Sequence, residues 1–240
     1  MSISFSNTTD NTGILQQTRQ MLRVDAAQYP TYRVVNSCNN WLDTVTGYAI
    51  GADSRFQWDD TNHTALPEAT ASLTINQSDY SFLTDAQGNA ILELTGVALL
   101  TNGKYYPLTP VDRNEASYDL ATFGTVSGTP TSYDKIADNI IRLDYLPPAT
   151  VALGLKFYFQ RTGSYFTATD TTKTPGVAPL LHRGFIIASV YDALLAGIGS
   201  ANLQAVSVEM QKEDMKMKEY FSNRNPDEKK RMTPARQDNR

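Results

Sequence analysis

The chain has 240 residues, enough for one large domain or two smaller ones with a sizeable hydrophobic core. A formal net charge of -4 is too small to indicate a nucleic-acid or membrane partner for the chain as a whole, and 41% hydrophobic residues are typical of a folded protein. The single cysteine, Cys38, excludes an intrachain disulfide and a cysteine-only zinc site, and fits folding in a reducing cytosol.

Two helices are the first elements predicted along the chain. Apolar residues at helical spacing predict a helix over residues 12–26. A second helix is expected to begin after Pro30, whose missing N–H is tolerated in a first turn, and to end at Gly51. Its predicted apolar face consists of Val34, Val35, Cys38, Trp41, Leu42, Val45, Tyr48 and Ala49.

Between residues 66 and 161 the pattern becomes that of short strands separated by turn residues. Asn102-Gly103 predicts a two-residue hairpin, because both residue types tolerate positive φ. The alternation of Leu155, Phe157 and Phe159 with polar neighbours predicts a strand with one buried face. The register around residues 88–100 stays open. The expected strands are 69–75, 80–83, 90–100, 104–108, 132–137, 140–145 and 152–160.

Two further helices are predicted after Pro179. The apolar face of the first is expected to include Leu181, Phe185, Ala188, Leu194, Leu195 and Ile198. Gly197 and Gly199 should end this helix, and Ser200 is expected to cap the next one. That last helix, 201–223, has a charged surface and is expected to end before Pro226.

These elements predict an α+β fold. We expect a helical bundle built from both ends of the chain, with an inserted antiparallel β-module of sandwich or barrel-like form. The expected units are residues 1–62 and 178–223 for the two parts of the bundle, and 63–177 for the β-module. Residues 224–240, rich in basic and poor in apolar side chains, are expected to form a flexible, extended tail.

Residues that could act in catalysis or bind a metal are few, and they form no catalytic motif in the sequence. The two histidines, His63 and His182, are too few for a multi-histidine metal site, and we interpret His182 as a packing or capping residue. Asp59, Asp60 and His63 lack the alternating ligands of a calcium loop and are interpreted as an acidic turn. Cys38 is interpreted as a small buried apolar residue. We therefore expect no enzyme, no cofactor and no metal.

An ordered series of short motifs covers residues 30 to 235, most of the chain. The series resembles a family of structural proteins of tailed-phage virions, the head–tail adaptor or connector proteins. The motifs, in chain order, are Arg55-Phe-Gln-Trp58-Asp59-Asp60-Thr-Asn62, Gln77-Ser-Asp-Tyr80, Leu108-Thr-Pro-Val-Asp112, Gly128-Thr-Pro-Thr-Ser-Tyr133, Phe157-Tyr-Phe-Gln-Arg161, Asp170-Thr-Thr-Lys-Thr-Pro-Gly176 and Leu181-His-Arg183.

The resemblance implies a ring of twelve copies that docks on the portal protein and links the capsid to a downstream tail or neck protein. Genomic DNA would pass through the lumen without specific binding. The protein would be made in the cytoplasm of the host bacterium and reside at the head–tail junction of the virion, with no membrane partner. The tail would reach the portal through its basic residues Arg224, Lys229, Lys230, Arg231, Arg236 and Arg240.

Other functions stay open at this point. The chain could be another neck protein, a tail-completion protein or a tail-tube protein, which would differ in copy number. The 13 tyrosines, several of them in the β-region, also leave open a carbohydrate-binding module of a receptor-binding protein. Such a module predicts exposed, coplanar rings and would leave the helices unexplained.

Overall fold

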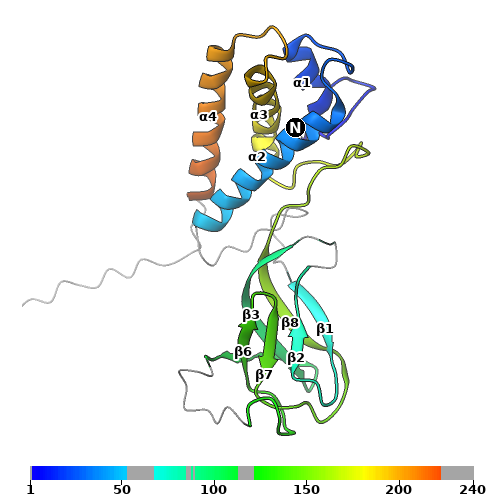
Figure 1. Cartoon of the computed structure of the whole chain (residues 1–240), viewed down its shortest axis with the longest axis vertical. Coiled ribbons are helices and arrows are strands. Elements are labelled where there is room, and N and C mark those ends of the chain that lie inside the picture. The colour runs from blue at the N-terminus through cyan, green and yellow to red at the C-terminus, as the bar shows by residue number, and fades with distance from the viewer. Residues whose placement is uncertain (1, 53–67, 85–87, 89, 113–121, 223–240) are drawn as a thin grey trace, which may run out of the picture.

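The computed structural model describes residues 2–52, 68–84, 88, 90–112 and 122–222. Within them the chain is a mixed α+β protein, with helices from both ends of the sequence at one end of the long axis and two β-sheets at the other (Figure 1). The helices are α1 (Ile14–Leu22), α2 (Thr31–Ala52), α3 (His182–Leu195) and α4 (Leu203–Ser222), with the 3-10 turn η1 (Pro179–Leu181) before α3.

The two N-terminal helices follow the predicted apolar pattern. Of the eight residues predicted for the inner face of α2, seven are buried and Tyr48 is partly buried. Two predicted boundaries are wrong. Helix α1 is shorter than 12–26, because Arg23 adopts a left-handed conformation with φ of 57° and ends it. Helix α2 continues through Gly51 to Ala52, so Gly51 does not end it.

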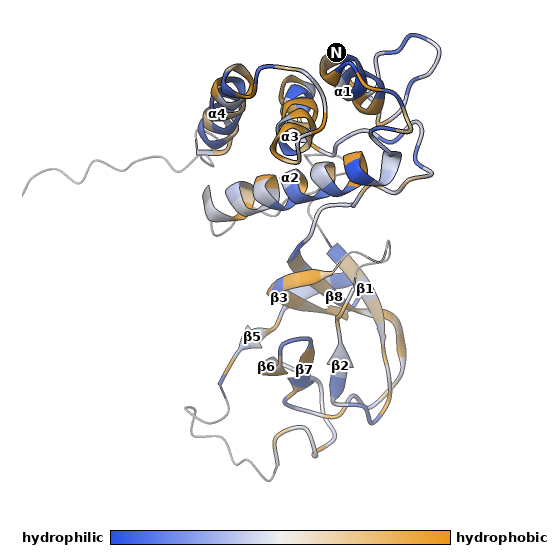
Figure 2. Ribbon diagram, turned by 45° about the horizontal axis from the view of Figure 1, so that its top comes forward, coloured by the Kyte–Doolittle hydropathy of each residue, from blue (hydrophilic) through white to orange (hydrophobic). Residues whose placement is uncertain are grey.

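Helix α3 lies at the centre of the helical part, in contact with α1, α2 and α4 (Figure 2). Every residue from Gly184 to Val190 is buried, so α3 has no solvent face over this stretch. The predicted position of Leu195 on the apolar face is wrong, since this side chain is exposed. Gly197 and Gly199 follow the end of α3 with φ of 73° and 93°, so the helix ends at these glycines as predicted.

The cap of α4 differs from the prediction. The side-chain oxygen Oδ1 of Asn202, rather than Ser200, accepts hydrogen bonds from the backbone N–H groups of Gln204 and Ala205, at 3.0 and 3.2 Å. Val206, Met217 and Phe221 of α4 join residues of α1, α2 and α3 in one hydrophobic core. Helices from the two ends of the sequence therefore share a single apolar interior.

The strands form two four-stranded sheets. One sheet has the order β1-β8-β3-β4 and the other β2-β7-β6-β5. The named strands pair antiparallel except β5 with β6, which are parallel, and β5 was not predicted. An isolated parallel bridge also joins Ser127 to Leu146. Within the described residues the sheets remain separate and form no closed barrel. The strands are β1 (Glu68–Leu73), β2 (Asp79–Ser81), β3 (Ile91–Thr101), β4 (Lys104–Pro107), β5 (Thr109–Pro110), β6 (Ser132–Ala137), β7 (Ile140–Leu143) and β8 (Val151–Arg161).

The side chains between the sheets form a second hydrophobic core, separate from that of the helices. Leu155, Phe157 and Phe159 of β8 are buried in it, as the alternating pattern predicted. The prediction of a single buried face fails at the end of the strand, because Gln160 is buried as well. The hairpin between β3 and β4 also has the predicted geometry, because Asn102 and Gly103 have φ of 51° and 76° and Thr101 pairs with Lys104. Each part of the chain thus has its own apolar interior.

The segment that follows β8 joins the two parts. The side chain of Asn39 on α2 accepts a hydrogen bond from the backbone N–H of Phe166 at 2.8 Å and donates one to its C=O at 3.0 Å. The hydroxyl of Tyr165 donates to Asp43 at 2.6 Å. Further on, the backbone N–H of Phe5 donates to the C=O of Lys173. These bonds fix the exit of the β-module against α2 and the N-terminal segment.

Candidate functional site

Helix α4 carries the densest set of charges in the described part of the chain. Glu209 pairs with Lys212 at 2.7 Å and with Arg183 of α3 at 3.2 Å. The hydrogen bond from Lys212 lowers the pKa of Glu209. Lys218 pairs with Asp214 at 2.7 Å. Exposed pairs of this kind contribute little to stability. Their main effect is to hold the charged side chains in defined positions on the solvent-facing surface of α4.

Two polar contacts attach α4 to its neighbours. The hydroxyl of Tyr48 on α2 donates a short hydrogen bond to Asp214, and burial of the phenol together with this bond raises the pKa of Tyr48. The Lys216 ammonium donates to the C=O of Leu180 at 2.6 Å. Helix α4 is therefore held by polar contacts at its edges as well as by its buried apolar face.

The outward face of α4 is not purely polar. Val208 and Met215 lie seven residues apart, which places them on one face, and both are exposed. Leu203 at the start of the helix and Leu195 at the end of α3 are exposed as well. Apolar side chains interspersed with fixed charges suit a protein-contact surface. The charged helix expected from the sequence is thus present. Its surface also carries exposed apolar residues, which the sequence prediction of a charged surface did not include.

The basic residues predicted for portal binding, Arg224, Lys229, Lys230, Arg231, Arg236 and Arg240, lie outside the described residues. The same is true of Asp59, Asp60 and His63, and of Pro226. Their predicted roles therefore stay predictions. Helix α4, at Ser222, is the described element that leads into the tail.

His182 is buried at the start of α3 and holds two backbone groups. Its Nδ1 accepts a hydrogen bond from the N–H of Ile3 at 3.0 Å, and its Nε2 lies 2.9 Å from the C=O of Val177. These contacts correspond to the neutral ring protonated on Nε2. The ring links the N-terminal segment to the residues before η1, in agreement with the packing interpretation.

Cys38 is a buried core residue. It has no exposed surface, and its Sγ lies 3.4 Å from Oγ of Ser189. Burial raises the pKa of the Cys38 thiol to about 12, which leaves it protonated and unreactive at neutral pH. The interpretation of Cys38 as a small apolar residue is therefore confirmed.

The tyrosines of the β-region mostly have structural contacts. Tyr133 is buried, which raises the pKa of its phenol. The Tyr80 hydroxyl accepts a hydrogen bond from the N–H of Thr74 at 3.0 Å. The Tyr105 hydroxyl donates to the C=O of Leu153 at 2.7 Å. Two other rings of the β-module, Tyr106 and Tyr145, are largely exposed, and they lie on β4 and after β7.

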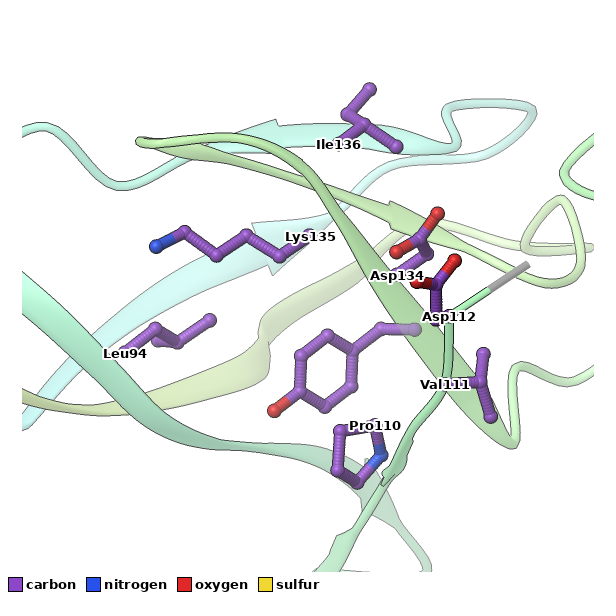
Figure 3. A pocket seen from close by; sticks show the side chains of 8 residues that line it. Leu94, Pro110, Val111, Asp112, Asp134, Lys135 and Ile136 are labelled. Atoms are coloured by element: carbon purple, nitrogen blue, oxygen red, sulfur yellow. The ribbon is translucent and has the colours of Figure 1, made fainter. Parts of the chain in front are cut away.

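A pocket of about 470 Å³ lies beside the parallel pair β5 and β6 (Figure 3). The side chains of Asp112 and Asp134 lie next to each other at one side of it, and Lys135 extends along another (Figure 3). It was not predicted, because the two-residue strand β5 gives no periodic signal. The lining residues are Leu94, Pro110, Val111, Asp112, Tyr133, Asp134, Lys135 and Ile136.

Among the described residues, no group of three or more histidine, cysteine, aspartate or glutamate side chains is placed to hold a metal ion. No helix in the same residues is long and apolar enough to cross a membrane. The sequence matches no known protein-family model. A comparison with curated proteins also finds no match.

Proposed function

We propose that this protein is a structural head–tail adaptor of a tailed bacteriophage. In this role it forms a ring of twelve copies that docks on the portal and links the capsid to the tail. It acts by assembly rather than catalysis, and DNA passes through its lumen. Its place is the head–tail junction of the virion.

The observation that carries the proposal is the interrupted helical core. Helices α1 and α2 from the start of the chain and α3 and α4 from its end share one apolar interior, and a β-unit with its own interior is inserted between them. We describe this as a helical bundle with an inserted β-sandwich. This order of helices, strands and helices is also the order expected from the resemblance of the sequence motifs to phage adaptor proteins.

The proposed contact surface is the outward face of α4. Its exposed Val208 and Met215 would be buried against a neighbour, and the charges beside them would select the partner and the register. A surface that meets a different surface on the next copy produces a closed ring when the rotation between copies fits. The basic tail would add a weak contact with the portal, multiplied by the number of copies.

The test is the native mass of the protein, measured alone and after mixing with the portal of the same phage. A complex with about twelve copies per portal supports the proposal. A six-fold ring that does not bind the portal would instead identify a tail-completion or tail-tube protein. Trimers that bind an oligosaccharide would identify a receptor-binding module.

A further inference from the structure

The turn of the hairpin between β3 and β4 has a composition and an exposure that bear on its chemistry. Asn102-Gly103 is the only asparagine–glycine pair in the sequence. Both residues are exposed, and beyond the neighbouring residues nothing lies within 4 Å of a Cβ added at Gly103. The side-chain amide of Asn102 and the backbone N–H of Gly103 are therefore adjacent at an open, solvated turn.

An asparagine followed by glycine can lose its side-chain amide to water without an enzyme. The backbone nitrogen of Gly103 attacks Cγ of Asn102, so that a new N–Cγ bond forms and the Cγ–Nδ2 bond breaks. Ammonia leaves and takes the proton of the Gly103 N–H. Glycine favours this step, because it has no Cβ to hinder a close approach of its backbone. Water then opens the resulting succinimide ring at one of its two carbonyl carbons, and no oxidant or reductant is needed.

The two ring-opening products differ in their effect on the hairpin. Opening at Cγ leaves an aspartate at position 102, and Asp-Gly suits the same turn as Asn-Gly. Opening at the main-chain carbonyl leaves an isoaspartate, whose backbone runs through Cγ and is longer by one carbon. The pairing of Thr101 with Lys104 fixes the length of this loop, so the longer backbone does not fit the register of the hairpin.

Strand β4 is the element that the longer backbone would displace. It has four residues and lies at the edge of its sheet, where β3 is its neighbour. Its Tyr105 hydroxyl donates a 2.7 Å hydrogen bond to the C=O of Leu153, and the Lys156 ammonium lies 5.4 Å from the centre of the ring. A short edge strand opens locally at a low cost in free energy. Such opening also gives the turn the rotational freedom that ring closure requires.

We propose that Asn102 is a site of spontaneous deamidation, and that the isoaspartate formed there releases β4 from the sheet. The reaction uses water as its co-reactant and adds a negative charge at the tip of the hairpin. The β-module thereby acquires a change that accumulates with time. The proposal goes beyond the adaptor function and does not depend on it, since α4 and the helical core take no part in the reaction.

The experiment is peptide mapping by mass spectrometry of the full chain, fresh and after incubation at pH 8 and 37 °C. Asn76 is the internal control, because it is also exposed and has φ of 58° but is followed by Gln77. We expect the amide of Asn102 to be exchanged for a carboxylate severalfold faster than that of Asn76. Deamidation of Asn102 that is no faster than that of Asn76 would overturn the assignment of the site.

Gly103→Asn is the matched variant for the rate of the reaction. Asparagine tolerates the φ of 76° at this position, so the turn is kept. Its Cβ and side chain hinder the attacking nitrogen, and deamidation at position 102 should become slower. An unchanged rate in this variant would show that ring closure by the following nitrogen is not the route.

Hydrogen exchange of the β4 amides tests the effect on the sheet. These amides should exchange faster in incubated protein that contains isoaspartate than in fresh protein. Asn102→Asp introduces the charge without the longer backbone, and it should protect β4 as well as the fresh wild type does. Unchanged protection in the isoaspartate-containing protein would contradict the release of β4. An equal loss of protection in Asn102→Asp would assign that release to the charge and overturn the backbone explanation.

Discussion

The backbone N–H of Ile3 donates a hydrogen bond to Nδ1 of His182, across 179 positions of sequence. The other ring nitrogen lies 2.9 Å from the C=O of Val177. One buried imidazole therefore joins the N-terminal segment, the segment after the β-module and the start of α3. Substitutions at His182 should test how much the helical core depends on this junction.

We expect His182→Ala to lower the free energy of unfolding by about 2–4 kcal/mol, because two buried backbone groups lose their partner and a cavity is left. His182→Asn, which can keep one of the two hydrogen bonds, should lose less. Urea denaturation measures both values, and hydrogen exchange at the amide of Ile3 should accelerate in the alanine variant. Equal stability of His182→Ala and the wild type would contradict this role.

Cys38 should make the protein less stable at high pH. Burial raises the pKa of its thiol from the ordinary 9.0 to about 12. Above pH 9 the unfolded chain loses this proton while the folded chain keeps it, so the unfolded state is favoured as the pH rises towards 12. The contribution to the slope is about 1.4 kcal/mol per pH unit at most.

The comparison with Cys38→Ala isolates this effect, because burial also raises the pKa of Tyr165 to about 12 and the tyrosines add to the slope in both proteins. Urea denaturation at pH 8, 9, 10 and 11 should show a shallower decline for Cys38→Ala. Identical slopes for the two proteins would show that the thiol does not titrate as described. Thiol reagents should label native Cys38 only as fast as the protein opens.

Two glycines should respond to alanine in opposite directions. Gly103 has φ of 76° in the hairpin between β3 and β4, so Gly103→Ala should destabilise the protein by about 1 kcal/mol or more. Gly47 lies on the exposed side of α2 with nothing within 4 Å of an added Cβ, and Gly47→Ala should stabilise it by about 0.5–1 kcal/mol. Thermal and urea denaturation check both signs, and a shared sign would contradict the assigned backbone geometry.

Met215 on α4 should matter for assembly and not for folding. We expect Met215→Asp to weaken assembly of the ring on the portal by about tenfold or more, because the carboxylate would be buried in the contact between neighbouring copies. Its unfolding free energy should change little, since Met215 is the most exposed of the large apolar residues described. Met21→Asp on α1 is the matched control and should assemble normally. Equal binding by both variants would exclude the α4 face as the contact.

The sequence predicted the elements whose signals are local. The apolar face of α2, the alternation along β8 and the Asn102-Gly103 hairpin all depend on residues a few positions apart. The register of β3 could not be assigned from the sequence, and the structure explains why. The pairing of β3 with β8 shifts between Ile91 and Glu93 and again between Leu94 and Gly96. Each irregularity moves the alternating pattern to the other face.

The remaining errors arise from tertiary contacts that no local pattern encodes. Helix α3 is buried on nearly every side, so one apolar stripe was too simple a description. Strand β5 exists because Thr109 and Pro110 lie beside β6, and its two residues are too few to form a pattern. The pocket forms from segments distant in sequence. The positive φ of 54° at Leu153 likewise had no signature in the residue types.

The interrupted helical core has a consequence for the order of events during synthesis. About 130 residues separate Ala52 at the end of α2 from His182 at the start of α3. Translation proceeds at about 5–20 residues per second, so roughly 6–26 s pass between the synthesis of α2 and that of α3, the helix that covers the apolar faces of α1 and α2. The β-module needs only residues up to Arg161 to complete its interior. In a nascent chain stalled after Arg161 has left the ribosomal exit tunnel but before α3 has emerged, the β-module should resist protease while the N-terminal helices are still cut.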